Sequence, residues 1–251
     1  MVITHTCNSL DELSHLLIKR FIQLAKETIK KSGSFHVAFS GGRTPQLFFK
    51  LLTQPDYSDQ ILWGKIHLYI CDERFVPLSH ADSNFGVLKK ILIDNIPIPA
   101  DQIHFIQTEQ LTAEEAALRY AQELQQHLPK DINQQPQFDF ILLGIGEDGH
   151  IASLFPDTTI LSVTDKIAAA VFVEKLQAFR ISLTFSIING AKQVAFIVTG
   201  RNKAPILKQI FSNTLTQPIY PVQMLKIQGQ TEWYLDSAAA ENLETNAHHP
   251  N

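Results

Sequence analysis

The chain has 251 residues, of which 45% are hydrophobic and 18% charged, and its formal net charge at pH 7 is −4. This composition is typical of a folded domain with a sizeable core and excludes a chain that is disordered throughout. The acidic balance and the lack of a long basic run argue against a nucleic-acid partner, and the two cysteines, Cys7 and Cys71, lack the spacing of a disulfide framework or a Cys-based zinc site. Without a secretory pattern or an apolar run of membrane-spanning length, we expect a cytoplasmic protein with no membrane partner.

The first half of the chain alternates helical and extended patterns. Apolar residues at helical spacing predict a helix over residues 11–31, with Ser9 as its cap. Strands are expected over residues 35–40 and 65–73. Further helices are expected over residues 45–53, 84–95 and 112–128. Repeated strand-then-helix order with continuously apolar strands predicts a mostly parallel sheet.

The second half continues this alternation after a surface loop at residues 129–137. Strands are expected over residues 138–146, 193–200 and 232–236, a helix over 203–213, and a strand leading into a helix or turn over 179–190. We therefore predict one Rossmann-like α/β domain, residues 1–240, with helices on both faces of the sheet. The last residues, 241–251, are expected to be a frayed tail.

Four of the predicted strands end in sequence that carries chemical groups. These ends read "SGGRTP" (40–45), "CDER" (71–74), "GIGEDGH" (144–150) and "VTGRNK" (198–203). Ligands of open parallel sheets bind beyond the carboxyl ends of the strands, so the four segments are expected to meet at one edge. This convergence is the main indication of function.

The "SGGRTP" segment suits an anion. Its glycines, Gly41 and Gly42, allow backbone N–H groups to approach a ligand closely, Ser40 and Thr44 add hydroxyl groups, and Arg43 adds charge. A tight turn that only caps the next helix is the plainer interpretation. The segment is not a Walker motif, because G-x-x-x-x-G-K-[ST] is absent.

Charged side chains from the other strand ends extend this candidate site. Asp72 and Arg74 follow a buried-looking strand and are placed to face a cleft, although a solvated charge cluster is the alternative. Asn84 belongs to a turn that reaches the same edge, and Lys203 stands at a helix start, where a surface lysine is the common case and a phosphate partner the functional one. Arg180 opens a strand, which would put it near the opposite edge unless the preceding loop folds back.

The "GIGEDGH" segment has the G-x-G-x-x-G spacing of a dinucleotide-binding turn, at Gly144, Gly146 and Gly149. Its position after the midpoint of the chain, with no strand leading into an acid at the required distance, disfavours that interpretation. His150 beside these turns is suited to act as a general base, whereas a histidine bonded to loop backbone is the plainer alternative. No group of residues with metal-ligand spacing and no G-x-S-x-G elbow is visible, so we expect no metal and no serine nucleophile.

Taken together, these segments resemble the 6-phosphogluconolactonase family. The resemblance covers most of the chain and rests on "SGGRTP", "CDERFVP" with "DSNFG", "GIGEDGHIASLFP" and "RISLTFSIINGAKQVAFIVTGRNKA", in family order. The related glucosamine-6-phosphate deaminases share "DGHIA" but continue with "FNEP" where this chain has "SLFP", and carry "DEY" where it has "DER". The lactonases usually carry prolines before the "RITLT" strand, whereas this chain reads "EKLQAF" there, which bears on the placement of Arg180.

The resemblance implies hydrolysis of 6-phospho-D-glucono-1,5-lactone to 6-phosphogluconate, the second step of the oxidative pentose phosphate pathway. His150 would be the base, Asp148 or Asp72 would orient its ring or hold sugar hydroxyls, and a glycine turn containing Gly146 would face the substrate. The phosphate would lie against residues 40–44, Arg74 and Lys203. No cofactor is implied, and the expected partner is a small sugar phosphate bound by a monomer or weak homodimer. A deaminase or aldose–ketose isomerase and a non-catalytic sugar-phosphate sensor are the alternatives.

Overall fold

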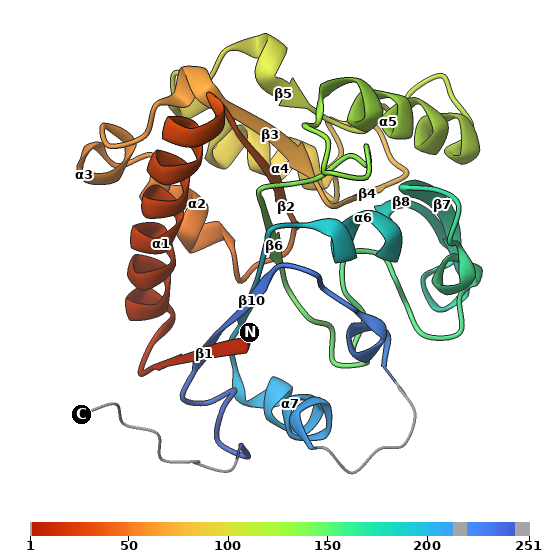
Figure 1. Cartoon of the computed structure of the whole chain (residues 1–251). Coiled ribbons are helices and arrows are strands. Elements are labelled where there is room, and N and C mark those ends of the chain that lie inside the picture. Colours follow the sequence, from red (N-terminus) through yellow and green to blue (C-terminus); the bar gives the residue numbers. More distant parts are fainter. Residues whose placement is uncertain (1, 213–219, 244–251) are drawn as a thin grey trace.

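A computed structural model describes residues 2–212 and 220–243 and has a seven-stranded sheet at its centre (Figure 1). The strand order is β1-β10-β9-β6-β2-β3-β5, and every neighbouring pair is parallel. The strands are β1 (Val2–Cys7), β2 (Phe35–Phe39), β3 (Ile66–Ile70), β5 (Ile103–His104), β6 (Phe140–Leu143), β9 (Gln193–Val198) and β10 (Gln230–Asp236). The prediction of a Rossmann-like, mostly parallel sheet is confirmed.

The order of the strands changes direction between β2 and β6. From β2 the chain adds β3 and β5 on one side, and from β6 it adds β9 and β10 on the other. Loops that leave neighbouring strands on either side of such a switch point diverge and leave a crevice at the carboxyl ends. The fold therefore leaves a crevice where the sequence carries "SGGRTP" and "GIGEDGH".

The helices lie on both sides of the sheet, with α1 and α2 on one side and α5 and α6 on the other (Figure 1). They are α1 (Leu10–Ser32), α2 (Gln46–Leu52), α3 (Pro55–Ser58), α4 (Asn84–Ile91), α5 (Ala113–His127), α6 (Phe185–Gly190) and α7 (Ala204–Phe211). Short 3₁₀ segments occupy Trp63–Lys65, Ile93–Asn95, Ala100–Gln102, Thr159–Ser162, Glu174–Leu176, Arg201–Lys203 and Pro221–Met224. Sequence chemistry explains the ends of the longest helix, because the side chain of Ser9 accepts the N–H of Glu12, and Gly33 ends the helix in the left-handed conformation.

A second, antiparallel sheet of three strands is attached to the first and was not predicted. It consists of β4 (Asp72–Arg74), β8 (Ala178–Leu183) and β7 (Ala168–Val173), in the order β4-β8-β7. The segment 179–190 thus does not contribute to the parallel sheet. Three strands escaped prediction: β7 begins with alanines, which have weak strand propensity, β1 is an edge strand of alternating exposure, and β5 has only two residues.

The core between α1, α2 and the sheet is aromatic. Phe21 of α1 contacts Phe35, Phe48 and Phe140 with ring centroids 5.5–5.8 Å apart, and each ring is fully or almost fully buried. The rings meet at steep angles, the edge-to-face arrangement that aromatic quadrupoles favour. This packing fixes the helices that carry the chain into and out of β2.

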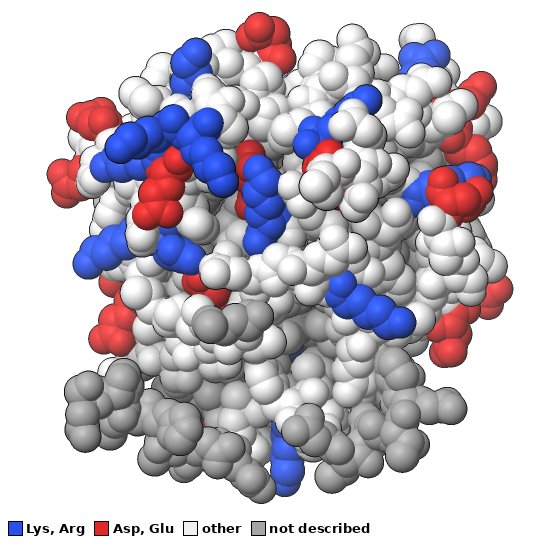
Figure 2. All heavy atoms as spheres, viewed as in Figure 1, with Lys and Arg blue, Asp and Glu red and all other residues white. Residues whose placement is uncertain are grey.

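Figure 2 shows Lys and Arg side chains gathered in the upper left and centre of this face, with Asp and Glu among them and along both margins. Within the described part of the chain no helix has the length and apolar character needed to cross a bilayer. Of the expected tail, residues 241–243 are described, with Leu243 packed against the core, and residues 244–251 lie outside the described part, as does the predicted helix end at Asn213.

Candidate active site

A cavity of about 540 Å³ opens at the carboxyl ends of the central strands, at the switch point between β2 and β6. It is lined by residues from all four strand ends that the sequence singled out. The predicted site residues in its wall are Ser40, Gly41, Gly42, Arg43, Thr44, Asp72, Arg74, Asn84, Gly146, His150 and Lys203. The structure therefore brings together segments that are up to 163 positions apart in the sequence, from Ser40 to Lys203.

Two predicted site residues, Asp148 and Arg180, do not line this cavity. Asp148 lies behind His150 and contacts it directly, and Arg180 lies on β8, opposite Arg74 of β4 in the antiparallel register. The sequence left open whether Arg180 lies near the opposite edge or beside the site; β8 belongs to the small sheet and runs antiparallel to β4, so Arg180 lies beside Arg74.

His150 is held by Asp148 through its Nδ1 atom. The distance from Nδ1 to Asp148 Oδ1 is 2.5 Å, and the same carboxylate oxygen accepts the backbone N–H of His150 at 3.3 Å. The ring stacks on Phe155 with centroids 4.0 Å apart. This fixes the ring plane and leaves Nε2 as the nitrogen available to a ligand, since among the described residues none is hydrogen-bonded to it.

Asp148 is held in turn by Lys175, whose Nζ contacts the second carboxylate oxygen. Burial raises the pKa of the Asp148 carboxyl, but hydrogen bonds from His150 and Lys175 outweigh it and lower the pKa well below its usual range. Asp148 is therefore an anion at neutral pH. A carboxylate in this position selects the tautomer of His150 that carries its proton on Nδ1.

The glycines of this loop allow the histidine and the acid to approach. A Cβ atom at Gly146 would overlap the ring of His150 and approach Asp148, whereas one at Gly144 would meet nothing within 4 Å. The N–H of Gly146 bonds to the carbonyl of His150 at 2.9 Å and that of Gly149 to the carbonyl of Gly146 at 3.1 Å. The loop is a compact turn that presents His150, and two of its N–H groups are occupied within it.

Glu73 is a structural anchor, a role that the sequence did not indicate. It is fully buried and accepts the backbone N–H groups of Arg74, Asn84 and Phe85 at 2.7–2.8 Å. Burial raises its pKa, an effect that these hydrogen bonds oppose. Glu73 thereby ties β4 to the start of α4 and fixes two residues of the cavity wall.

The polar partners of Asn84 and Asp72 distinguish their positions. Asn84 donates from Nδ2 to the carbonyl of Asp72 at 2.8 Å and packs over Gly41, where a Cβ would overlap its side chain. Asp72 accepts the hydroxyl of Ser153 at 2.7 Å. Of the two acids considered for orienting His150, Asp148 is the one that contacts it.

Three cations, Arg43, Arg74 and Lys203, line the cavity together with two acids, Asp72 and Glu147. The directly paired positions of Arg74 and Arg180 bring two guanidinium groups together, and burial together with the charge of Arg74 lowers the pKa of Arg180. Arg74 donates to the carbonyl of Asp82 at 2.5 Å. Burial also lowers the pKa of Lys203, with Glu147 and Asp148 opposing this effect. An anion bound here would relieve the repulsion between like charges.

Comparison with known proteins identifies the family. A family model described as glucosamine-6-phosphate isomerases/6-phosphogluconolactonase matches residues 8–233. A 6-phosphogluconolactonase of Haemophilus influenzae is 41% identical over 83% of this chain and 87% of that protein, and one of Synechocystis is 35% identical over 91% and 94%. The crystal structure of the devB protein superposes with a TM-score of 0.88 at 33% identity and covers 97% of this chain and all of that one.

The chain belongs to the glucosamine-6-phosphate isomerase/6-phosphogluconolactonase family. Its departure from the lactonase pattern, the segment "EKLQAF" that forms the turn after β7 and the first two residues of β8, has a visible consequence. This loop supplies Lys175, which contacts Asp148 and lies 4.6 Å from the centre of the Phe155 ring. The lysine was not predicted, because nothing in the sequence shows that a hairpin of the second sheet folds over the glycine-rich loop.

The sequence shows no group of residues with metal-ligand spacing, whereas the structure brings His104, Glu123 and His127 together at the edge of the central sheet. None of the three lines the cavity, so the group is separate from the residues described above.

Proposed function

We propose that this protein hydrolyses 6-phospho-D-glucono-1,5-lactone to 6-phosphogluconate, the second step of the oxidative pentose phosphate pathway. The observation that carries the proposal is His150, bonded through Nδ1 to an ionised Asp148, in the wall of a cavity that also contains Arg43, Arg74 and Lys203. The cavity thus pairs a positioned base with positive charge for a phosphate. The lactonases among the family's members support the same assignment.

The proposed reaction begins with a water molecule on the lactone carbonyl carbon, C1. A sugar δ-lactone is an activated ester, so attack by water needs no covalent intermediate on the enzyme. His150 takes a proton from the attacking water at Nε2, and Asp148 stabilises the imidazolium that forms. The C1–O5 bond then breaks and the proton passes from Nε2 to the departing ring oxygen, which returns His150 to its starting state.

The negative charge that develops on the carbonyl oxygen requires a partner. The N–H groups of Gly146 and Gly149 are occupied within their own loop, so neither is assigned this role. Loss of one group that stabilises an oxyanion typically raises the barrier by about 2.7–4 kcal/mol.

The phosphate is assigned to the other side of the cavity, against the turn of residues 40–44, Arg74 and Lys203. Arg180 adds positive charge directly beside Arg74. A phosphate held far from C1 does not take part in bond breaking, but it orients the lactone so that C1 faces His150. We propose that the enzyme works in the cytoplasm as a monomer or weak homodimer, without a cofactor and without a nucleic-acid or membrane partner.

The decisive experiment offers the protein freshly generated 6-phosphoglucono-δ-lactone and, separately, glucosamine 6-phosphate. We expect rapid lactone hydrolysis above the spontaneous rate and no release of ammonia from the amino sugar. Release of ammonia would assign the protein to the deaminases of its family. Binding of both sugar phosphates with turnover of neither would indicate a sensor.

A further inference from the structure

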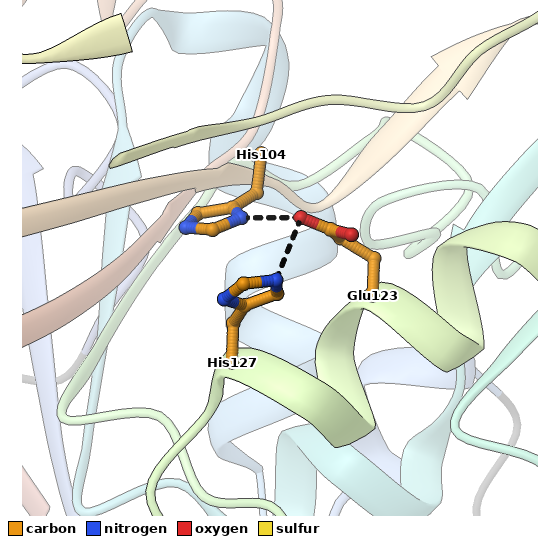
Figure 3. Close-up of side chains that lie close together, drawn as sticks. All are labelled: His104, Glu123 and His127. Atoms are coloured by element: carbon orange, nitrogen blue, oxygen red, sulfur yellow. Dashed lines mark hydrogen bonds and ion pairs between the residues drawn. The ribbon is translucent and has the colours of Figure 1, made fainter. Parts of the chain in front are cut away.

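A second histidine–carboxylate group lies at the β5 edge of the central sheet (Figure 3). His104 is the last residue of β5, and Glu123 and His127 stand four positions apart on α5. Each offers a ligand atom, and these three atoms lie within 4.8 Å of one another. Two elements that are separate in the sequence thus direct three metal-ligating groups at one point.

The geometry is close to that of a tetrahedral metal site. One oxygen of Glu123, Oε1, lies 2.7 Å from His104 Nδ1 and 3.6 Å from His127 Nε2, and Figure 3 shows both rings presenting a nitrogen to it. Zinc–ligand bonds of about 2.0–2.2 Å place tetrahedral ligand atoms roughly 3.3 Å apart. Small side-chain rotations would therefore convert the present contacts into a coordination sphere.

The ring of His104 is held in place by contacts on the side away from Glu123. Its other ring nitrogen, Nε2, lies 3.1 Å from His67 Nδ1, and its ring stacks on Tyr69 with centroids 4.2 Å apart. A metal on Nδ1 requires the proton of His104 on Nε2, from which it donates to His67. Such an outer hydrogen bond fixes the tautomer and the orientation of a ligating histidine.

The other two ligands leave room for metal entry. Glu123 is 38% exposed and His127 36%, whereas His104 is buried. A buried ligand on a strand and two half-exposed ligands on a helix leave one side open to water. Two imidazoles and one carboxylate with an open fourth position form a donor set that suits Zn²⁺.

We propose that His104, Glu123 and His127 bind one Zn²⁺ ion, with water as the fourth ligand, and that the ion joins α5 to the edge strand β5. The ion takes no part in the proposed hydrolysis, because none of the three residues lines the cavity. An ion that binds only the folded protein raises the midpoint of thermal unfolding.

The test measures Zn²⁺ affinity of the metal-free full-length chain by competition with a chromophoric chelator. The adjacent histidines His248 and His249 are replaced by alanine in every protein, so that they contribute no binding. We expect one ion per chain, and a loss of affinity of about 100-fold or more in Glu123→Gln and in His127→Ala, since loss of an outer-shell partner alone costs roughly 10- to 100-fold. His67→Phe is expected to weaken binding by about tenfold.

The matched control is His15→Ala. Asp11 and His15 form the same i,i+4 acid–histidine pair, at 3.5 Å on α1, but they do not belong to the group of three ligating side chains found among the described residues. The control should bind Zn²⁺ like the parent. Zn²⁺ should also raise the unfolding midpoint of the parent and of the control by several degrees, and leave Glu123→Gln unchanged.

The proposal is overturned by any of three results: no Zn²⁺ uptake by the parent, equal affinity in the parent and both ligand variants, or loss of binding in His15→Ala. Because both ligand substitutions lie on the half-exposed face of α5, their circular dichroism should match that of the parent. The binding readout is independent of lactone hydrolysis, so it stands or falls apart from the proposed function.

Discussion

The chain places a histidine against a carboxylate in two regions, and the two pairs are similar at first sight. His150 Nδ1 lies 2.5 Å from Asp148, and His104 Nδ1 lies 2.7 Å from Glu123. The difference is at the other ring nitrogen. No described residue is hydrogen-bonded to Nε2 of His150, and that ring lines a cavity. Nε2 of His104 instead contacts His67.

The comparison also extends to the carboxylates. Asp148 contacts both His150 and the cation Lys175, and these contacts keep its carboxyl group ionised. Glu123 is shared between two histidines and has solvent beside it. A histidine–carboxylate contact therefore does not by itself define a role; what faces the remaining nitrogen and the remaining oxygen decides between proton transfer and metal binding.

The largest expected effect is that of His150→Ala. Removal of the general base should lower kcat for lactone hydrolysis by about 10²–10⁴-fold and leave affinity for 6-phosphogluconate nearly unchanged. Stopped-flow hydrolysis and calorimetry measure the two quantities. The matched change in the other region, His127→Ala, should leave kcat at the parent value. Near-parent turnover in a folded His150→Ala protein would remove His150 from the mechanism.

Gly146→Ala should have the next largest effect. Its Cβ would displace the His150 ring and Asp148, and a shift of about 1 Å in a reacting group can cost roughly 100-fold in rate. Gly144→Ala is the control, because a Cβ there meets nothing within 4 Å. Steady-state kinetics of both variants are compared. Equal activities would show that the position of the ring relative to the loop does not limit the reaction.

Arg74→Ala or Lys203→Ala should weaken 6-phosphogluconate binding by about ten- to a hundred-fold, because a charge-assisted hydrogen bond contributes roughly 1.5–3 kcal/mol. Unphosphorylated gluconate should bind these variants no worse than it binds the parent. Calorimetry with both ligands makes the comparison. An equal loss for the two ligands would mean that these cations serve the sugar or the fold, and the assigned position of the phosphate would be wrong.

A smaller effect is expected on stability at acid pH. It comes from His36, whose ring stacks on His67, the neighbour of His104. Burial, reinforced by neighbouring charges, lowers the pKa of His36 to about 3. The ionisable groups around it are His67, Tyr69, His104, His127, Asp139 and Lys192. In the unfolded chain the His36 side chain takes up a proton near pH 6.5, whereas in the folded protein it stays neutral down to about pH 3. The contribution of His36 to the free energy of unfolding is therefore complete above about pH 6.5 and declines as the pH falls towards 3.

Between pH 7 and pH 5 this one histidine should reduce the free energy of unfolding by about 2 kcal/mol. Urea titrations with a chelator present, on the parent and on His36→Gln, measure the pH-dependent loss, which should be smaller in the variant. His80→Gln, at an exposed histidine, is the control and should keep the loss of the parent. An identical loss in all three proteins would contradict the prediction.

The smallest expected effect is that of chelation on catalysis, which should be none. The lactone is already activated, and the group of metal-ligating residues lies outside the cavity. Hydrolysis rates before and after exhaustive chelation check this. A loss of activity that one added divalent ion restores would contradict this prediction. It would show that a metal ion supports catalysis in the cavity.

The sequence alone determined the parts of this protein that depend on local chemistry. Continuous apolar runs predicted the buried parallel strands, caps such as Ser9 located helix starts, and glycines and charges at the strand ends located the residues that line the cavity. These features are local because each depends on the few residues around it. The common geometry of parallel sheets then brings the ends of β2, β6 and β9 to one edge.

Only the tertiary structure decided which of these residues touch. Asp148 rather than Asp72 contacts His150, Lys175 reaches Asp148 from a hairpin of the unpredicted sheet, and Arg180 lies beside Arg74. At the edge of the sheet, His104 lies beside Glu123 and His127, which come 19 and 23 positions later in the sequence. The sequence indicated none of these three ligands, because a contact between a strand and a helix depends on how the two pack and not on either alone.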